Sequence, residues 1–223
     1  MANDTSTQSD SVVVIGLGRF GSAVAESLVR LGHEVLGIDE RAEHVQKWAD
    51  RLTHVVEADT TDSNVLRRLS VQDFGHAVVG IGTDIEASVL TVLGLSELGV
   101  PDIWAKATSA NHGRILERTG AHHVVLPEAA MGERVAHMVT GKMIDLIEFD
   151  DGFAIVKKRA PLEAVGKTLE QSALRRKYGV TIVGIKRPKT DFTYARPETV
   201  VEAGDLIIVS GPTMLVQKFA ALT

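Results

Sequence analysis

Three glycines, at positions 16, 18 and 21, follow an apolar run with the spacing G-x-G-x-x-G. Gly16 allows a sharp turn after a strand, Gly18 lets the backbone approach a phosphate without an intervening Cβ atom, and Gly21 lets a helix pack closely on the strand. The free N–H groups and the dipole of that helix favour an anion at its start. The motif therefore predicts a site for the phosphates of a nucleotide.

An acidic residue at the end of the next predicted strand strengthens this prediction. Asp39 lies 18 residues after Gly21, where a carboxylate can accept hydrogen bonds from both ribose hydroxyls. It disfavours a 2′-phosphate, because two anions would meet at low dielectric, although the nearby Arg41 weakens that objection. A tight turn followed by a surface aspartate is the alternative explanation, and the strand–turn–helix context makes it the weaker one.

Arg19 belongs to the phosphate-binding turn itself. A positive charge in the first turn of a helix is unfavourable by the helix dipole, so an anionic partner explains Arg19 better than a solvated surface position does. Its guanidinium can neutralise a second or third phosphate.

Polar residues also follow later strands of the predicted sheet. Asp59 can accept a hydrogen bond from an adenine amino group or cap the next helix, and both roles stay open. Gly82 allows close approach of ribose or phosphate, and Lys106 ends the fifth strand at the same crevice. Glu128, in the first turn of a later helix, either favours the helix dipole or reaches a cation on bound phosphates.

The elements that hold these residues alternate between strand and helix. Six such units precede residue 142, and they predict an α/β fold with a Rossmann-like parallel sheet and helices on both faces. The expected strands are 12–15, 34–38, 54–57, 76–80, 103–107 and 122–126.

The pattern changes after residue 141. We expect a hairpin near 144–158, one amphipathic helix within 161–178, short strands at 180–186, 193–195 and 206–210, and a final helix at 212–222. The sequence thus predicts three parts: a disordered polar lead-in at residues 1–10, a nucleotide-binding domain at 11–141 and a small α+β domain at 142–223.

Composition restricts the class of function. The 223 residues include no cysteine, which excludes disulfides and thiolate chemistry and fits a reducing cytosol. A net charge of −5 gives no general basic field for nucleic acid. The sequence contains no apolar stretch that approaches the roughly 18 residues needed to span a bilayer.

The second predicted domain lacks the residues expected of a catalytic domain. A dehydrogenase needs a positioned acid or base beside the nicotinamide, yet all eight histidines lie between residues 33 and 137. A small NAD-dependent oxidoreductase stays as an alternative, as does an NAD(H)-sensing redox regulator, for which the N-terminus lacks a basic DNA-reading element. ATP, ADP and NAD(H) share their ribose and diphosphate contacts, so the nucleotide is left open.

Several segments together resemble an RCK (KTN, TrkA-type) domain followed by its C-terminal (TrkA-C) domain. The resemblance covers nearly all of the chain from Val12 onward, and it is similar to the gating subunits of Ktr and Trk potassium-uptake systems. The segments are G-L-G-R-F-G at 16–21, A-D-T at 58–60, G-I-G-T at 80–83, I-W-A-K-A at 103–107, L-P-E-A-A-M-G at 126–132, R-K-Y-G-V-T-I-V-G-I-K at 176–186 and A-G-D-L-I-I-V-S-G at 203–211.

The resemblance implies a regulatory protein and no enzyme: a sensor of ATP, ADP or NAD(H) that changes quaternary shape with the bound ligand. Arg19 would reach the terminal phosphate of ATP at a dimer interface, Asp39 would hold the ribose, and Asp59 and Thr60 would line the adenine end. The implied nucleotide site comprises Gly16, Gly18, Arg19, Phe20, Gly21, Asp39, Glu40, Arg41, Asp59, Thr60, Ile81, Gly82, Thr83 and Lys106.

Two further ligands follow from the same resemblance. Glu128 matches the acidic position of a cation site, for a divalent ion or Na⁺, although E-A-A-M-G replaces the family's frequent E-x-D-M-G and lacks its second acid. Some C-terminal RCK domains bind cyclic di-AMP, and the matching positions here are Leu169, Arg175, Thr181 and Pro197.

The implied partners are a membrane-embedded potassium channel or transporter subunit and further copies of this chain. A homodimer would assemble into a larger ring, an octamer by resemblance, in the cytoplasm at the inner face of the cell membrane, with no nucleic acid bound. The helix expected at 85–98 has apolar residues on more than one face. Either part of it packs on a second subunit, or the helix is buried between the sheet and its neighbours.

Overall fold

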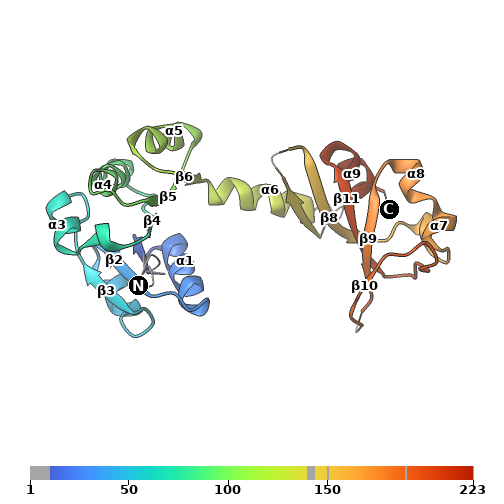
Figure 1. Ribbon diagram of the computed structural model, residues 1–223, viewed down its shortest axis with the longest axis horizontal. Helices are drawn as coiled ribbons and strands as arrows, with labels where there is room; N and C mark the ends of the chain where they lie inside the picture. The colour runs from blue at the N-terminus through green and yellow to red at the C-terminus, as the bar shows by residue number, and fades with distance from the viewer. Residues whose placement is uncertain (1–10, 140–143, 150, 189, 223) are drawn as a thin grey trace, which may run out of the picture. The chain divides into compact units, whose positions relative to one another are not determined.

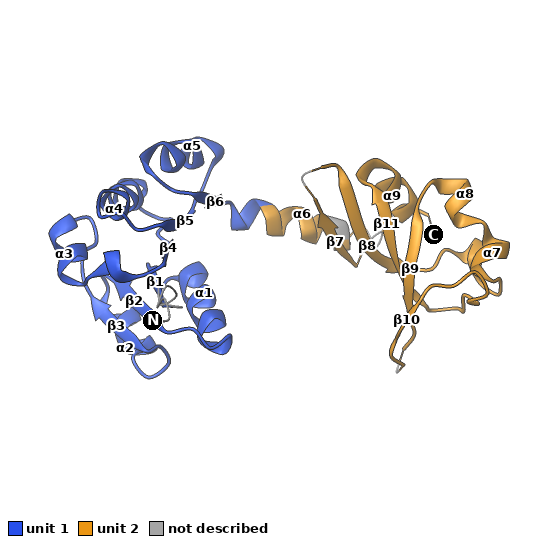
Figure 2. Ribbon diagram, in the orientation of Figure 1, with its two compact units in different colours: residues 1–129 blue, residues 130–223 orange. Residues whose placement is uncertain are grey.

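The chain forms two compact units that divide between residues 129 and 130 (Figures 1 and 2). The computed structural model describes residues 11–139, 144–149, 151–188 and 190–222. The predicted lead-in at 1–10 and the boundary predicted at 141/142 both fall outside these residues. The observed division lies inside helix α6 (Pro127–Val139), which therefore contributes to both units.

The first unit is built on a six-stranded parallel sheet in the order β3-β2-β1-β4-β5-β6. The strand order changes direction between β1 and β4, which is where such sheets open a crevice at their carboxyl edge. The predicted Rossmann-like sheet is confirmed. Its strands are β1 (Val12–Ile15), β2 (Val35–Asp39), β3 (His54–Glu57), β4 (His76–Val79), β5 (Asp102–Lys106) and β6 (His123–Val125).

Helices cover both faces of this sheet. Successive residues of a strand point to opposite faces, so the apolar side chains of each strand must be buried on both sides. Val12 and Val14 of β1 pack in one core with residues of α1 and α2. Val13 and Ile15 pack in the other with residues of α3, α4 and α5. The helices are α1 (Arg19–Arg30), α2 (Ala42–Trp48), α3 (Ser63–Arg68), α4 (Ile85–Glu97) and α5 (Ala110–Thr119), with a 3₁₀ turn η1 (Val71–Asp73).

The second unit has a five-stranded antiparallel sheet in the order β10-β9-β11-β8-β7. Helix α9 packs on β8 and β11 and buries Val216 and Phe219 in the core of this unit. The predicted hairpin and α+β composition are confirmed. The elements are β7 (Asp145–Glu148), β8 (Phe153–Arg159), β9 (Thr181–Lys186), β10 (Phe192–Tyr194), β11 (Leu206–Pro212) and α9 (Thr213–Ala220).

The prediction of a single amphipathic helix within residues 161–178 is wrong. The segment instead forms a 3₁₀ turn η2 (Leu162–Ala164) and two short helices, α7 (Leu169–Ser172) and α8 (Leu174–Tyr178), broken at Ala173 with φ 51°. The amide of Leu169 donates to Thr199 O at 2.9 Å, and that of Glu170 to Pro197 O at 2.9 Å. These bonds join the start of α7 to the segment between β10 and β11. The left-handed alanine that ends α7 costs on the order of 1 kcal/mol.

Candidate nucleotide-binding site

The glycine loop between β1 and α1 leaves space beside its middle glycine. Gly16 has φ 85°, and a Cβ atom on Gly21 would lie 1.9 Å from Gly16 O, so α1 touches the end of β1 backbone to backbone. A Cβ atom on Gly18, the N-cap of α1, would meet nothing within 4 Å. The geometry thus leaves room for a ligand at Gly18 and none at Gly21.

Gly80, at the end of β4, completes the same crevice although it was absent from the predicted site. A Cβ atom there would lie 2.9 Å from Gly16 O and 3.1 Å from the Cα of Gly21. The half-buried Ile81 approaches Gly16 next to it, whereas Thr83 is exposed. The repeated glycines at 80 and 82 were the signal in the sequence, but only the β1–β4 pairing shows what Gly80 contacts.

Asp39 fastens the glycine loop to β2. Only 6% of its surface is exposed, and its Oδ2 accepts from the amide of Leu17 at 2.6 Å. The same oxygen lies 2.8 Å from Nδ1 of His44, and Oδ1 accepts from the amide of Arg41 at 3.0 Å. A ribose hydroxyl would therefore share a carboxylate that already orients the loop, and His44 is a neighbour that sequence reasoning missed.

The other predicted residues of this segment lie at its surface. Glu40 is exposed, and the side chain of Arg41 is 59% exposed with its Nε 3.9 Å from Asp39 Oδ1. The Nη2 atom of Arg41 also contacts the imidazole of His44. One basic side chain thus already balances the acid that was predicted to repel a 2′-phosphate.

Two cations flank the open turn. Arg19 is exposed as the first residue of α1, whose first turn contains no acidic residue. Lys106, at the end of β5, has a side chain only 14% exposed; its Nζ lies 5.9 Å from the ring centre of Phe20. It also lies 3.2 Å from the place that a Cβ atom of Gly82 would take. The structure therefore brings together residues predicted from three separate segments.

Glu128 joins this group through an ion pair. Its Oε1 accepts from Lys106 Nζ at 2.7 Å. The hydrogen bond from Lys106 lowers the pKa of Glu128, and the charge of Arg19 lowers it further. The residue predicted for a cation and the lysine predicted for phosphate are thus direct partners.

The residues predicted at the adenine end have unequal positions. Asp59 is exposed and accepts from the amide and the hydroxyl of Thr61, and these hydrogen bonds lower its pKa. It does not cap α3, because Asp62 does so through the amide of Asn64. Thr60 is buried and its Oγ1 lies 2.9 Å from Thr91 Oγ1, so its side chain faces α4. The capping role of Asp59 is therefore wrong, and its contact with an adenine stays a prediction.

The four positions matched to a cyclic di-AMP site lie in the second unit. Leu169 is partly buried against the core, and Pro197 lies beside it through the hydrogen bond of the next residue's amide. Arg175 is exposed on α8, and Thr181 begins β9 opposite Ser210 of β11. This second ligand stays a prediction.

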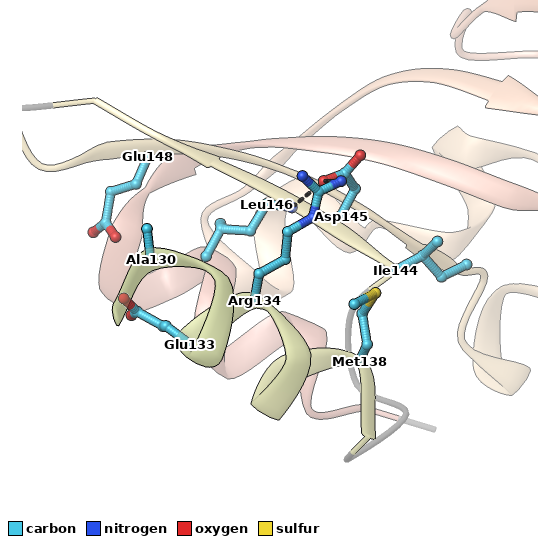
Figure 3. A pocket seen from close by; sticks show the side chains of 8 residues that line it. All are labelled: Ala130, Glu133, Arg134, Met138, Ile144, Asp145, Leu146 and Glu148. Atoms are coloured by element: carbon cyan, nitrogen blue, oxygen red, sulfur yellow. Dashed lines mark hydrogen bonds and ion pairs between the residues drawn. The ribbon is translucent and has the colours of Figure 1, made fainter. Parts of the chain in front are cut away.

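A pocket in the second unit contains none of the predicted residues (Figure 3). It lies between α6 and β7, where Arg134 and Asp145 point toward each other and form an ion pair at 3.0 Å. Met138 and Ile144 line its other end. In the part of the chain that the structure describes, no three His, Cys, Asp or Glu side chains are grouped so that they could hold a metal ion.

The sheet order, the glycine loop at the β1–β4 switch and the acid at the end of β2 define a Rossmann nucleotide-binding fold. Residues 12–127 match the TrkA-N domain, and residues 154–223 match the TrkA-C domain. None of the helices among the described residues is long and apolar enough to cross a membrane.

The chain belongs to the family that includes the Ktr system potassium uptake proteins. It is 36% identical over 207 residues to Ktr system potassium uptake protein A of Bacillus subtilis (strain 168), covering 92% of this chain and 93% of that protein. It is 38% identical over 207 residues to protein C of the same organism, covering 92% and 94%. The predicted RCK (TrkA-type) resemblance is confirmed.

Solved structures share the fold at low identity. The RCK domain of GsuK has a TM-score of 0.67 and 19% identity, covering 100% of this chain and 48% of that chain. The GsuK channel bound to NAD has a TM-score of 0.66 and 18% identity, covering 100% and 40%. GsuK bound to ADP has a TM-score of 0.52 and 18% identity, covering 60% and 35%. The chain spans about half or less of the length of these GsuK chains.

Proposed function

We propose that this chain is a regulatory subunit of a potassium-uptake system and that it senses adenine nucleotides. Its relatives in Bacillus subtilis are Ktr system potassium uptake proteins, and GsuK, which shares its fold, has structures with NAD and with ADP. The observation that carries the proposal is the open Gly18 turn flanked by the cations Arg19 and Lys106. Phosphates would lie against this turn, with the ribose toward Asp39.

Sensing requires that the ligands differ in affinity for two shapes of the protein. ATP has one phosphate more than ADP, and Arg19 is the exposed cation at the start of α1. We assign the discrimination to Arg19. ATP bridges two protomers through Arg19 and stabilises one shape of a homo-oligomeric ring. ADP lacks that contact, so the ring relaxes to its other shape. A membrane-embedded channel or transporter subunit at the cytoplasmic face would respond to the change.

Substitution of Arg19 tests the assignment. We expect Arg19→Ala to weaken ATP binding about tenfold or more, in line with the loss of a charge-assisted contact, and to leave ADP binding within about threefold. Isothermal titration calorimetry with both nucleotides measures this preference. Arg30→Ala is the matched control, because it removes an exposed arginine from the other end of the same helix. An unchanged ATP-over-ADP ratio in Arg19→Ala would show that another group discriminates.

The alternative function is that of an NAD-dependent oxidoreductase, which would turn over a substrate as well as bind a nucleotide. The residues gathered at the crevice are glycines, two cations and two carboxylates engaged in hydrogen bonds, which suit binding. Mass spectrometry of the nucleotide retained on purification distinguishes ATP or ADP from NAD(H). Steady turnover of NAD(H) with a metabolite would favour the oxidoreductase.

The proposed cation and cyclic di-AMP sites extend the same function. Glu128 would take part in binding a divalent cation or Na⁺ beside the phosphates, together with oxygens of the nucleotide. Leu169, Arg175, Thr181 and Pro197 would contribute to a second-ligand site of the TrkA-C domain. Both bind ligands that would adjust the shape set by the adenine nucleotide.

A further inference from the structure

Lys106 has a carboxylate partner at the carboxyl edge of the parallel sheet. Its Nζ donates to Glu128 Oε1 at 2.7 Å, and the two side chains differ sharply in exposure, 14% for the lysine against 67% for the glutamate. Gly82 and Phe20 border the lysine. The ammonium group is therefore confined to the crevice, and the carboxylate at its surface is the member free to move.

The two partners belong to different kinds of element. Lys106 ends β5 in the parallel sheet, whereas Glu128 is the second residue of α6. Helix α6 continues past residue 129 into the second unit (Figure 2). The ion pair thus links the end of β5, at the proposed nucleotide site, to the first turn of α6, which continues into the second unit.

A phosphate at the Gly18 turn would compete with Glu128 for the same ammonium group. Phosphate oxygens are strong acceptors for charge-assisted hydrogen bonds, and the pair with Glu128 is a surface pair of modest strength. Arg19 remains as the other cation whose charge acts on Glu128.

We infer that Lys106 is an exchangeable counter-ion, which gives up Glu128 for a nucleotide phosphate, so that nucleotide binding releases the first turn of α6. The inference rests on the proposed nucleotide binding. It adds that the Lys106–Glu128 pair couples occupancy of the nucleotide site to the start of α6. The released carboxylate lies beside the phosphates, where a cation would then be favoured.

A double-mutant cycle with ADP, in a sodium-free buffer that contains a chelator of divalent cations so that no cation binds at Glu128, tests the exchange. Glu128→Gln frees the lysine in advance, so ADP should bind about two- to fivefold tighter than to the unmodified chain, the range expected for breaking a surface ion pair. In the Lys106→Gln background the same glutamate substitution should change affinity by less than about 1.5-fold. Simple repulsion between Glu128 and phosphate predicts an equal gain in both backgrounds, and that result would overturn the exchange.

Glu86→Gln is the matched control. Glu86 is an exposed carboxylate in the first turn of α4, at the same sheet edge, so its removal reports the effect of net charge alone. It should leave ADP affinity within about 1.5-fold. Lys106→Met provides a second lysine variant, and tryptophan fluorescence confirms that each variant keeps the first unit folded.

Hydrogen exchange of α6 amides gives an independent readout. ADP should speed exchange in the first two turns of α6 in the unmodified chain, whereas Glu128→Gln should show the faster exchange already without ADP. If the unmodified chain binds ADP but exchange in α6 is the same with and without it, the inference fails and the proposed function stands. If neither ADP nor ATP binds, both fail.

Discussion

Lys158 shows how a single buried charge is accommodated in the second unit. The residue is 3% exposed on β8, and its Nζ donates to the carbonyls of Phe219 at 3.1 Å and Leu222 at 2.7 Å, at the end of α9. The ring of Phe219 lies 5.0 Å from the same nitrogen. Lys158 therefore donates to carbonyls at and just beyond the C-terminus of α9, and a cation is favourable at that end of a helix.

The titration of Lys158 should make the free energy of unfolding depend on pH. Burial lowers its pKa to about 8, below the ordinary value near 10.4 in the unfolded chain, so the unfolded state binds more protons between these values. The free energy of unfolding of the unmodified chain should thus rise from pH 8 to 10, relative to Lys158→Met, by roughly 1–3 kcal/mol. Urea unfolding of both proteins at several pH values measures the difference.

Lys157→Met is the control for that measurement, since Lys157 is the next residue of β8 and is only half-buried. Its difference from the unmodified chain should stay constant over the same pH range. A constant difference for Lys158→Met as well would mean that the buried lysine does not titrate near pH 8.

At the scale of the element, the loop between β1 and α1 combines two glycines with opposite demands. Gly21 is needed for packing, because any side chain there meets the backbone of Gly16. Gly18 has φ −64° and open space around it, so folding does not require glycine at that position. A requirement for glycine at 18 would come from the ligand.

Paired alanine substitutions separate these roles. Gly21→Ala should destabilise the first unit by about 2–4 kcal/mol through overpacking. Gly18→Ala should change stability by less than about 1 kcal/mol but weaken nucleotide binding at least about tenfold, because its Cβ would occupy the place of a phosphate. Denaturant unfolding followed by tryptophan fluorescence gives the first quantity, and calorimetry gives the second. Unimpaired nucleotide binding by Gly18→Ala would move the phosphates away from this turn.

At the scale of the whole molecule, the two units have separate hydrophobic cores. Both tryptophans, Trp48 and Trp104, lie in the first unit, and both tyrosines, Tyr178 and Tyr194, lie in the second. The chain therefore contains a natural optical probe for the unit that is proposed to bind the nucleotide.

This arrangement predicts selective stabilisation by ligand. A nucleotide at 100 times its Kd should stabilise the first unit by about 2.7 kcal/mol and leave the second unchanged. Selective tryptophan excitation should report an upward shift of the unfolding midpoint, while a second transition, followed by circular dichroism, stays in place. A single transition that shifts as a whole would mean that the units unfold cooperatively.

Local signals in the sequence determined the fold class and the strand–turn–helix segment in which a phosphate site is predicted. The strand, the turn with Gly16, Gly18 and Gly21, and the helix are contiguous, so their chemistry can be derived from spacing alone. Asp39 was recognisable because it ends the next strand in the chain. The family resemblance similarly depended on short motifs, and its nucleotide roles for individual residues remain predictions.

Only the tertiary structure decided which distant residues meet. The order of β4, β5 and β6 places Lys106 against Glu128, 22 positions away, and the packing of α4 turns Thr60 into the interior. The break at Ala173, with φ 51°, divides a segment whose periodicity alone favoured one helix. For Lys106 and Thr60 the deciding contact lies far along the chain, and residue spacing contains no information about it until the elements are packed.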